Sequence, residues 1–499
     1  MEKKGYFLYE VGNWSGNAQS DLSLLKSFVL FYIELIEGDT MKKLKDLIDT
    51  TYDMVVNGIT DDSRLVKEGY VFVATKGFNV DHYDFIEDAI ENGCSLVIAD
   101  RDISYDIPYM VVDDIESLYR ELCLKYYDIN YSDFKFIGVT GTDGKTTTST
   151  IIKELIGDCA YLGTNGLTIG DKTISTSNTT PCISELYRDL SVVKDNNISN
   201  VSMEVSSEAL LHNRVEGFSY DIVCFTNVTG DHLNVHKTFD NYLNCKLKLL
   251  NYLKDDGKVV VNGDDVNLQK IKCNNLYTLG FDLRNDFVIT NVENGKYTTI
   301  TVKNKDNEYI IESPFKGNYN VYNVVMAFIV GLLLGIDELL LVSRIKKLGP
   351  ISGRCEFLDF GQDFDIVIDY AHTINGIKNI LESFKDYSNI ITVTGCAGGR
   401  ETSKRAIIGK IVMDNSDVSI FTMDDPRYEN VVDIIDQMVG DSKDYIRIVD
   451  RKEAIHYALS IASTGSVVLI LGKGRDNYMA IEDKKIVYND YDTIKSYYV

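Results

Sequence analysis

Short apolar segments alternate with helix-length segments along most of this 499-residue chain. VFVAT (71–75), SLVIAD (95–100) and FKFIGVT (134–140) are early examples, and NVSMEVS (200–206) and DIVCFTNVT (221–229) follow in the middle. Short β-rich runs separated by helical lengths predict parallel strands joined by crossover helices. The pattern therefore predicts α/β domains with doubly wound sheets.

The alternation continues in the last third of the chain. DIVIDYAH, NIITVTG, VSIFTMD and SVVLILGKG are strand candidates, and each ends in a glycine-rich or charged cluster. Ligands of doubly wound sheets bind at the carboxyl ends of the strands. We therefore expect functional sites at these clusters. VVMAFIVGLLLGI (324–336) is expected to be a buried helix.

Composition excludes several classes of function. The chain has 75 acidic and 51 basic residues, a net charge of −24, which opposes non-specific binding to nucleic acid or anionic membranes. No segment reaches the roughly 18–20 apolar residues of a membrane span, and no secretory signal is visible. The nine scattered cysteines include no C-x-x-C pair, which is typical of reduced thiols. We predict a cytoplasmic protein that neither inserts into membranes nor binds nucleic acid.

The segment IGVTGTDGKTTTST (137–150) joins a predicted strand to a predicted helix through a glycine loop. A strict phosphate-binding loop reads G-x-x-x-x-G-K-[ST], but Val139 stands where its first glycine should be. Backbone N–H groups and a helix N-terminus bind phosphate oxygens in such loops. An ordinary turn is the alternative, but G-K-T-T-T directly after a strand favours a nucleotide site. Lys145 would then contact phosphates and Thr146 would bind Mg²⁺.

TGTDGKTT resembles the form of this loop in the Mur ligase family, and further motifs follow in that family's order. DDSRLVKEGYVFVATKG with DHYDFI resembles the N-terminal domain of the branch that adds the third residue of the peptidoglycan stem. NTTP, MEVSSEALLHNRV, FTNVTGDHLNVHKTFDNYLNCK and GNYNVYN resemble its central domain. SGRCE, DYAHT, GCAGGRETSKR, DDPRYE and GKGRDNY resemble its C-terminal domain. The resemblance covers about residues 41–499.

The resemblance implies three α/β domains. A small UDP-sugar-binding domain is expected at 41–130, a central P-loop ATPase-type domain at 131–349, and a Rossmann-like domain that binds the amino acid at 350–499. Residues 1–40 look unlike the rest, and a ribosome-binding-site-like GGAGAT fits the codons just before Met41. We hypothesise that Met41 is the true start; a real N-terminal extension is the alternative.

The activity that the resemblance implies is ATP-dependent ligation of an amino acid to UDP-MurNAc-L-Ala-D-Glu in peptidoglycan precursor synthesis. A carboxylate is a poor electrophile, so ATP first converts it to an acyl phosphate, which the amine then attacks. The protein mainly supplies positioning and charge neutralisation. The expected partners are the UDP-MurNAc-dipeptide and a diamino acid, with the protein a monomer or weak oligomer.

The resemblance also assigns the catalytic centre, which needs ATP, two Mg²⁺ ions and CO₂. Lys145, Glu204, His232 and Lys246 are the expected catalytic residues, and Thr146 joins the last three as metal ligands. Lys246 is expected to carry a carbamate formed with CO₂, which requires an unprotonated amine. The alternatives are a capping or ion-pair role for Glu204, a structural His232, and a solvated Lys246 like the neighbouring Lys248. The residues expected to bind ATP are Gly141, Thr142, Asp143, Gly144, Lys145, Thr146, Thr147, Asn320, Asn323, Arg354 and Asp369.

The two remaining substrates are assigned in the same way. The UDP-sugar dipeptide is expected to contact Ser63, Arg64, Asn178, Thr179, Thr180, Ser206, His212 and Arg214. For each Thr or Ser, a local turn or cap is the alternative. The amino acid is expected to contact Arg400, Asp424, Asp425, Arg427, Gly472 and Asp476.

Arg427 favours meso-diaminopimelate as the added amino acid. Its guanidinium fork pairs with a carboxylate that lysine lacks, and Arg400 would bind the other carboxylate. Three departures from the family pattern keep L-lysine or another amine open. Asp425 replaces asparagine and adds a negative charge, Arg475 and Asp476 replace histidine and glutamate, and Glu208 replaces a common histidine.

Two other functions fit parts of the pattern. A folylpolyglutamate synthetase would share the superfamily, but the DDSR block and the DDPR motif argue against it. A non-catalytic ATP-binding regulatory paralogue would carry Glu204, His232 and Lys246 as vestiges. That protein would bind ATP without turnover that depends on an acceptor.

Overall fold

The computed structural model describes residues 41–76, 81–305 and 307–499, and it divides the chain into two compact units, Met1–Ile129 and Asn130–Val499. The hypothesis about Met41 as the start depends on residues 1–40, which lie outside the described residues. Each unit is described by itself below.

The first unit contains a parallel four-stranded sheet. Its strands lie in the order β3 (Gly58–Thr60), β4 (Tyr70–Ala74), β5 (Cys94–Ala99), β6 (Tyr109–Val111). VFVAT and SLVIAD therefore form the predicted strands, β4 and β5. The other strands and α-helices described in this unit are β1 (Lys42–Lys43), α2 (Leu44–Leu47), β2 (Val55–Val56), α3 (Ile86–Glu91) and α4 (Ile115–Tyr126).

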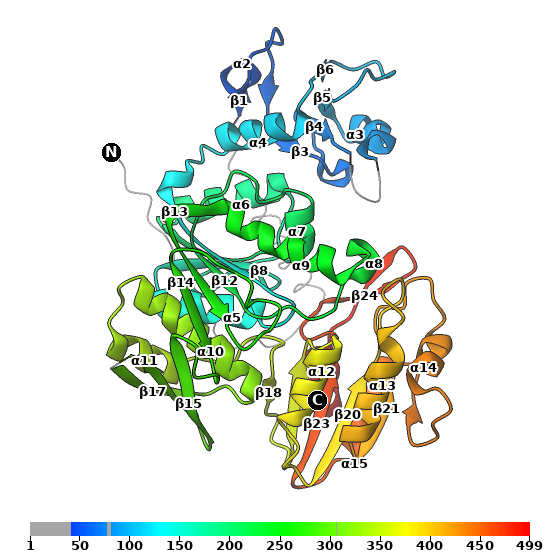
Figure 1. Cartoon of the computed structure of the whole chain (residues 1–499). Helices are drawn as coiled ribbons and strands as arrows, with labels where there is room; N and C mark the ends of the chain where they lie inside the picture. Colours follow the sequence, from blue (N-terminus) through cyan, green and yellow to red (C-terminus); the bar gives the residue numbers. More distant parts are fainter. Residues whose placement is uncertain (1–40, 77–80, 306) are drawn as a thin grey trace. The chain divides into compact units, whose positions relative to one another are not determined.

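The second unit contains an eleven-stranded sheet with β7 (Lys135–Thr140) near its middle. Side chains of β7 alternate between two apolar layers. Ile137 and Val139 pack with α5 (Lys145–Ile156), α10 (Asn318–Leu333) and α11 (Glu338–Lys346), whereas Phe136 packs on Phe218 and Tyr220. Figure 1 shows α5 and α10 beside the strands of this sheet. The predicted buried helix is α10.

The order of this sheet is β10-β9-β8-β11-β7-β12-β13-β14-β15-β16-β17. The strands from β8 to β15 in this order are parallel to one another, whereas β9 and β10 at one edge and β16 and β17 at the other pair antiparallel. The parallel strands agree with the prediction. The antiparallel strands at 287–313 were not predicted, because polar residues interrupt their sequences and they lack the continuous apolar run of a buried strand. The bounds are β8 (Cys159–Gly163), β9 (Gly166–Ile169), β10 (Lys172–Ile174), β11 (Asn200–Glu204), β12 (Tyr220–Phe225), β13 (Leu253–Asn262), β14 (Leu276–Gly280), β15 (Phe287–Asn294), β16 (Thr298–Asn304) and β17 (Asn307–Ser313).

A six-stranded sheet forms the C-terminal part of the same unit, in the order β18-β19-β23-β20-β21-β22, and only the β18–β19 pair is antiparallel. One face packs on α12, α13 and α14, and the other packs on α15 and α16, so this sheet is doubly wound as predicted. The strands are β18 (Glu356–Leu358), β19 (Asp365–Asp369), β20 (Asn389–Thr394), β21 (Val418–Phe421), β22 (Ile446–Arg447) and β23 (Ser466–Leu471). The helices are α12 (Ile374–Glu382), α13 (Lys404–Asn415), α14 (Val431–Val439), α15 (Arg451–Ile461) and α16 (Asp490–Tyr498).

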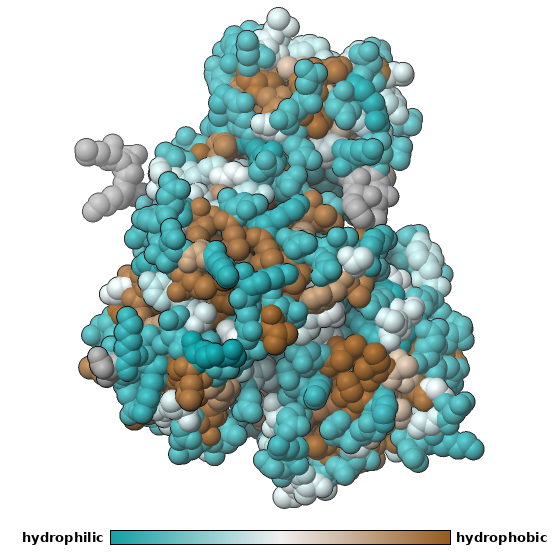
Figure 2. Space-filling model, in the orientation of Figure 1, coloured by the Kyte–Doolittle hydropathy of each residue, from teal (hydrophilic) through white to brown (hydrophobic). Residues whose placement is uncertain are grey.

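Shorter elements complete the second unit. A hairpin of β24 (Tyr478–Ile481) and β25 (Lys484–Val487) follows β23. The other α-helices described in this unit are α6 (Ile183–Asp195), α7 (Ser207–Leu211), α8 (Leu233–His236) and α9 (Phe239–Leu247). None of the helices in the described ranges is long and apolar enough to cross a membrane. On the face that Figure 2 shows, hydrophilic residues predominate and hydrophobic residues form separate patches.

Candidate active site

A cavity of about 810 Å³ in the second unit lies at the carboxyl ends of strands from both sheets. The segments after β7, β11 and β12 line it on one side, and those after β19, β20, β21 and β23 line it on the other. The clusters predicted to be functional in the two parts of this unit therefore meet at one site.

The glycine loop between β7 and α5 is an intact structural feature despite its unusual spacing. Val139 is a fully buried residue of β7, so no loop glycine is missing there. Gly144 has a φ of 85°, and a Cβ on it would lie 2.4 Å from Asn323 Oδ1. A Cβ on Gly141 would lie 1.8 Å from Thr226 Oγ1. Both positions therefore require glycine.

The segment after β12 holds the loop in place. Asn227 accepts hydrogen bonds from the loop, from Thr142 N to its carbonyl at 2.8 Å and from Asp143 N to Oδ1 at 3.0 Å. Thr226 Oγ1 donates to the Asp143 carbonyl at 2.6 Å. These bonds set the loop before any ligand binds, which lowers the cost of ordering it.

Two lysine amines meet at one carbonyl of this loop. Lys145 Nζ donates to Gly141 O at 3.0 Å, and Lys246 Nζ donates to the same oxygen at 2.7 Å. Burial and the charge of Lys145 hold the pKa of Lys246 well below its usual value. Lys246 is only 1% exposed, so it is not the solvated helix lysine of the alternative interpretation. Its surroundings favour the neutral amine that carbamate formation requires.

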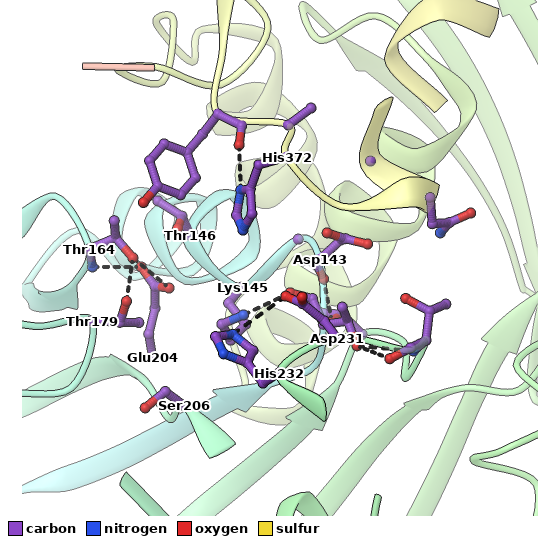
Figure 3. A pocket seen from close by; sticks show the side chains of 18 of the residues that line it. Asp143, Lys145, Thr146, Thr164, Thr179, Glu204, Ser206, Asp231, His232 and His372 are labelled. Carbon is purple, nitrogen blue, oxygen red and sulfur yellow. Dashed lines mark hydrogen bonds and ion pairs between the residues drawn. The ribbon is translucent and has the colours of Figure 1, made fainter. Parts of the chain in front are cut away.

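Glu204 ends β11 and is completely buried. Its carboxylate accepts hydrogen bonds from Tyr161 Oη at 2.5 Å, Thr164 N at 3.0 Å and Thr164 Oγ1 at 3.3 Å. Figure 3 shows this carboxylate beside Thr164 and Thr179 at the edge of the cavity. Among the described residues it neither caps a helix nor pairs with a cation, and it presents a fixed carboxylate to the cavity.

His232 follows β12 and lies between two carboxylates. Its Nδ1 is 3.5 Å from Glu208 Oε1, and its Nε2 is 3.4 Å from Asp231 Oδ2. Burial lowers the pKa of His232 to about 4, so its imidazole is neutral at pH 7. Lys404 Nζ, at the start of α13, lies 3.4 Å from Asp231 Oδ1. Figure 3 shows His232, Asp231 and Lys145 together in the cavity.

Two of the predicted metal ligands fit a hard cation by their chemistry. Glu204 offers carboxylate oxygens and Thr146 a hydroxyl, the donors that Mg²⁺ prefers together with waters and phosphate oxygens. Within the described residues, no three His, Cys, Asp or Glu side chains form a group that could hold a metal. A magnesium site here would therefore also need the Thr146 hydroxyl, the modified Lys246 or the nucleotide.

Residues next to the strands of the C-terminal sheet contact the glycine loop directly. Arg354 Nη2 donates to Thr146 Oγ1 at 2.9 Å, and Thr373 Oγ1 donates to Asp143 Oδ1 at 2.9 Å. Asp369 accepts from Cys355 N at 2.6 Å and Ala371 N at 2.7 Å, and burial raises its pKa. Both parts of the second unit thus contribute to one site around this loop.

Asn320 and Asn323 lie one helical turn apart in α10 and line the cavity. Asn323 Nδ2 donates to Asn320 Oδ1 at 3.0 Å, and Asn323 Oδ1 accepts from Thr148 Oγ1 at 3.2 Å. The hydrogen bond from Thr148 therefore fixes the orientation of the pair relative to α5, the helix that follows the glycine loop. An amide group that keeps a second N–H can still read a base edge.

The residues predicted to bind the UDP-sugar dipeptide fall into three groups. Four of them line the cavity: Asn178, Thr179, Ser206 and Arg214. In the described chain, Thr180 and His212 are not among the lining residues. Thr180 Oγ1 donates to the Glu204 carbonyl at 2.8 Å, which is a structural contact. In the first unit, Ser63 is buried, and the exposed Arg64 pairs with Asp62 at 2.6 Å.

The predicted acceptor residues Arg400, Asp424, Asp425, Arg427, Gly472 and Asp476 all line the cavity. Asp425 Oδ1 accepts from Lys473 Nζ at 2.8 Å and Ala480 N at 3.0 Å. The negative charge that Asp425 adds to the cavity is therefore paired with the buried ammonium of Lys473. Lys473 is 1% exposed and also lies 3.8 Å from Asp424 and 3.7 Å from Asp476.

The other departures from the family pattern differ in their surroundings. Arg475 is directed to Glu356, with Nε 2.9 Å from Oε2, and it stacks 3.8 Å over Tyr491; among the described residues it does not line the cavity. Asp476 does line it, and burial raises its pKa to about 6. Glu208 lines it beside His232.

Comparison with known proteins identifies the family. Three domain families match the chain: the Mur ligase middle domain at residues 139–331, the Mur ligase glutamate ligase domain at 353–474, and the Mur ligase family catalytic domain at 55–120. A UDP-N-acetylmuramoyl-L-alanyl-D-glutamate–2,6-diaminopimelate ligase from Fusobacterium nucleatum is 35% identical, and the match covers 92% of this chain and 96% of that protein. The chain belongs to the Mur ligase family.

Other members of the Mur ligase family match over similar lengths. A protein of the same name from Bacillus cereus is 33% identical over 91% of this chain and 98% of its own length. A solved structure of a diaminopimelate ligase of this name has a TM-score of 0.61 and 26% identity, covering 92% of this chain and 99% of that one. The MurF ligase of Thermotoga maritima in complex with ADP shares the fold, with a TM-score of 0.61 and 19% identity over 83% and 93% of the two chains.

Several residues that line the cavity of this Mur ligase, or that hold its lining residues, were not singled out from the sequence. His372, Lys404 and Lys473 lie inside motifs that resemble the family, DYAHT, GCAGGRETSKR and GKGRDNY, so the motifs contained the signal. Tyr161 and Thr164 lie in and after β8, outside any motif. Only their hydrogen bonds to Glu204 mark them.

Proposed function

We propose that this chain is an ATP-dependent ligase that adds meso-diaminopimelate to UDP-MurNAc-L-Ala-D-Glu in peptidoglycan precursor synthesis, releasing ADP and phosphate. One observation carries the proposal. The same cavity is lined by the glycine loop, which is the proposed phosphate loop, and by the DDPR motif that contains Arg427, which is the proposed acceptor motif. Lys145 and Lys246 meet at the Gly141 carbonyl of the phosphate loop. A ligase needs both in one space because the phosphorylated carboxylate and the amine must meet.

The nucleotide end is proposed to work as follows. The loop from Gly141 to Thr147 and the N-terminus of α5 bind the phosphates through backbone N–H groups. Lys145 leaves the Gly141 carbonyl and pairs with the phosphates, Arg354 approaches them from the C-terminal sheet, and Asn320 and Asn323 read the adenine. Mg²⁺ ions, when bound, neutralise phosphate charge, and Glu204, His232 and Thr146 are their proposed protein ligands.

Lys246 is proposed to carry a carbamate. Its neutral amine attacks CO₂, so that an N–C bond forms and one proton is released, which leaves an anionic carboxylate on the side chain. The neutral amine at the Gly141 carbonyl is thereby replaced by an anion beside Lys145, which stabilises it. The low pKa of Lys246 and its burial support this role.

The acceptor end positions a doubly zwitterionic amino acid. Arg427 and Arg400 are proposed to bind its carboxylates, and Asp476 its distal ammonium. Asn178, Thr179, Ser206 and Arg214 hold the dipeptide end of the second substrate. Ser63 and Arg64, in the domain proposed at 41–130, hold its uridine diphosphate. We retain the proposed domain bounds 131–349 and 350–499, the monomer or weak oligomer, and the cytoplasmic location.

Phosphate release from ATP tests this function, with Mg²⁺, UDP-MurNAc-L-Ala-D-Glu and one acceptor at a time. We expect release with meso-diaminopimelate and little with L-lysine, with the ligated product verified by mass spectrometry. Release with L-lysine alone would keep the ligase and overturn the specificity. ATP binding without release for any acceptor would support the regulatory alternative.

A further inference from the structure

One face of the β24–β25 hairpin lines the cavity beside the DDPR motif. Tyr478 and Lys485 line that cavity, whereas Met479, Ile481 and Ile486 line a separate hollow of about 260 Å³. The register pairs Ala480 with Lys485, and Tyr478 and Ala480 are two residues apart, so all three share one face of the hairpin. Strand alternation therefore presents Lys485 to the acceptor and turns its neighbour Lys484 away.

Backbone bonds fix this hairpin to the DDPR motif. Arg427 N donates to Ala480 O at 3.0 Å, and Glu482 N donates to Arg427 O at 2.9 Å. Ala480 N donates to Asp425 Oδ1 at 3.0 Å. Because Lys485 lies directly across from Ala480, its position is tied to that of Arg427.

The two lysines that flank Tyr478 differ in their partners. Lys473 is buried among Asp424, Asp425 and Asp476, so its charge is balanced within the protein. Lys485 Nζ lies 4.4 Å over the Tyr478 ring, and no carboxylate in the described part of the chain forms an ion pair with it. An exposed ammonium on the cavity wall, held over a ring beside Arg427, suits an anion that the ligand brings.

We propose that Lys485 is a specificity-determining residue that binds the distal carboxylate of the acceptor together with Arg427. This inference rests on the proposed function. Diaminopimelate supplies that carboxylate and leaves its distal ammonium to Asp476. L-Lysine supplies only an ammonium at that end, which Lys485 and Arg427 repel, so this wall both attracts one acceptor and rejects the other.

Steady-state kinetics of Lys485→Met and Lys484→Met test the inference, since both side chains are exposed and adjacent but face opposite sides. We expect Lys485→Met to raise the KM for meso-diaminopimelate about tenfold, the loss of one charge-assisted contact. The KM for ATP and kcat should stay within about twofold. Lys485→Arg should keep most of the affinity, and Lys484→Met should match the wild type. The ratio of kcat/KM for meso-diaminopimelate over L-lysine should fall about tenfold in Lys485→Met.

The outcomes separate this inference from the proposed function. A wild-type enzyme that ligates meso-diaminopimelate while Lys485→Met matches Lys484→Met would overturn the inference alone. A rise in the KM for ATP equal to that for the acceptor would also overturn it, because that result indicates a structural defect. A wild-type enzyme without meso-diaminopimelate turnover would overturn the proposed function and this inference together.

Discussion

The phosphate loop and the acceptor wall of the same cavity are built in different ways. The phosphate loop is one contiguous segment, shaped by two glycines and by hydrogen bonds between neighbouring backbone segments. The acceptor wall combines loops after β20, β21 and β23 with the β24–β25 hairpin. Buried charges hold these loops together. A site of the first kind depends on local backbone geometry, whereas one of the second kind also depends on buried side chains, such as Lys473, that do not line the cavity in the described chain.

Arg451 illustrates the second kind of construction. Its guanidinium is completely buried and pairs with Asp490 through two contacts of 2.8 Å. It also donates to Leu471 O at 3.0 Å and Met423 O at 3.4 Å, the carbonyls that immediately precede Gly472 and Asp424. One buried cation therefore connects two loops of the acceptor wall.

The largest effect should come from the phosphate-loop side. Lys246→Ala removes the amine at the Gly141 carbonyl, and we expect kcat to fall about 1000-fold or more, as when a preorganised charge at a reaction centre is lost. Bicarbonate at high concentration should not restore activity. Lys248→Ala, which removes an exposed lysine two residues away, is the control and should keep wild-type activity. Substantial activity in Lys246→Ala would rule out the carbamate role.

On the acceptor wall, loss of the buried Arg451–Asp490 ion pair should lower the stability of the protein. Arg451→Met leaves Asp490 buried without its cation, and we expect the free energy of unfolding to fall by about 3 kcal/mol in urea denaturation. Lys385→Ala breaks the exposed Lys385–Glu382 pair and should leave the free energy of unfolding close to that of the wild type. Equal stability of Arg451→Met and the wild type would show that the wall does not depend on this ion pair.

Direct contact with the acceptor can be separated from construction of the wall. Arg427→Ala should raise the KM for meso-diaminopimelate about 100-fold, because the distal carboxylate of the acceptor would lose its guanidinium partner. The KM for ATP should stay within about twofold. Arg475→Gln is the matched variant, since Arg475 also departs from the family pattern but pairs with Glu356. Equal increases in both KM values for Arg427→Ala would indicate a folding role instead.

The smallest effect should be a pH dependence confined to the acceptor. Burial raises the pKa of Asp476 to about 6, and only the ionised carboxylate attracts an ammonium. Acceptor affinity should therefore be constant above pH 7 and fall as the pH drops through about 6, with a KM about tenfold higher at pH 5. The KM for ATP measured in parallel should not follow this curve. Asp476→Asn should bind the acceptor weakly with no inflection near pH 6.

The sequence predicted the features that depend on contiguous residues. The strands β7, β11, β12, β19, β20, β21 and β23 were identified because buried parallel strands leave continuous apolar runs. Glu204, His232, Lys246 and Arg427 were named because each lies in a motif that resembles the Mur ligase family. The antiparallel strands at 287–313 were missed because their exposed faces carry threonine, lysine and asparagine.

By itself, the sequence determined the strand–helix alternation, the intact glycine loop and the family, because these depend on residues that are close together in the chain. Only the tertiary structure decided that Lys145 and Lys246 share the Gly141 carbonyl and that Tyr161 and Thr164 hold Glu204. It also decided that Lys473 pairs with Asp425 and that Lys485 lines the cavity. Such contacts join residues that sheet packing brings within bonding distance, and packing depends on the whole fold.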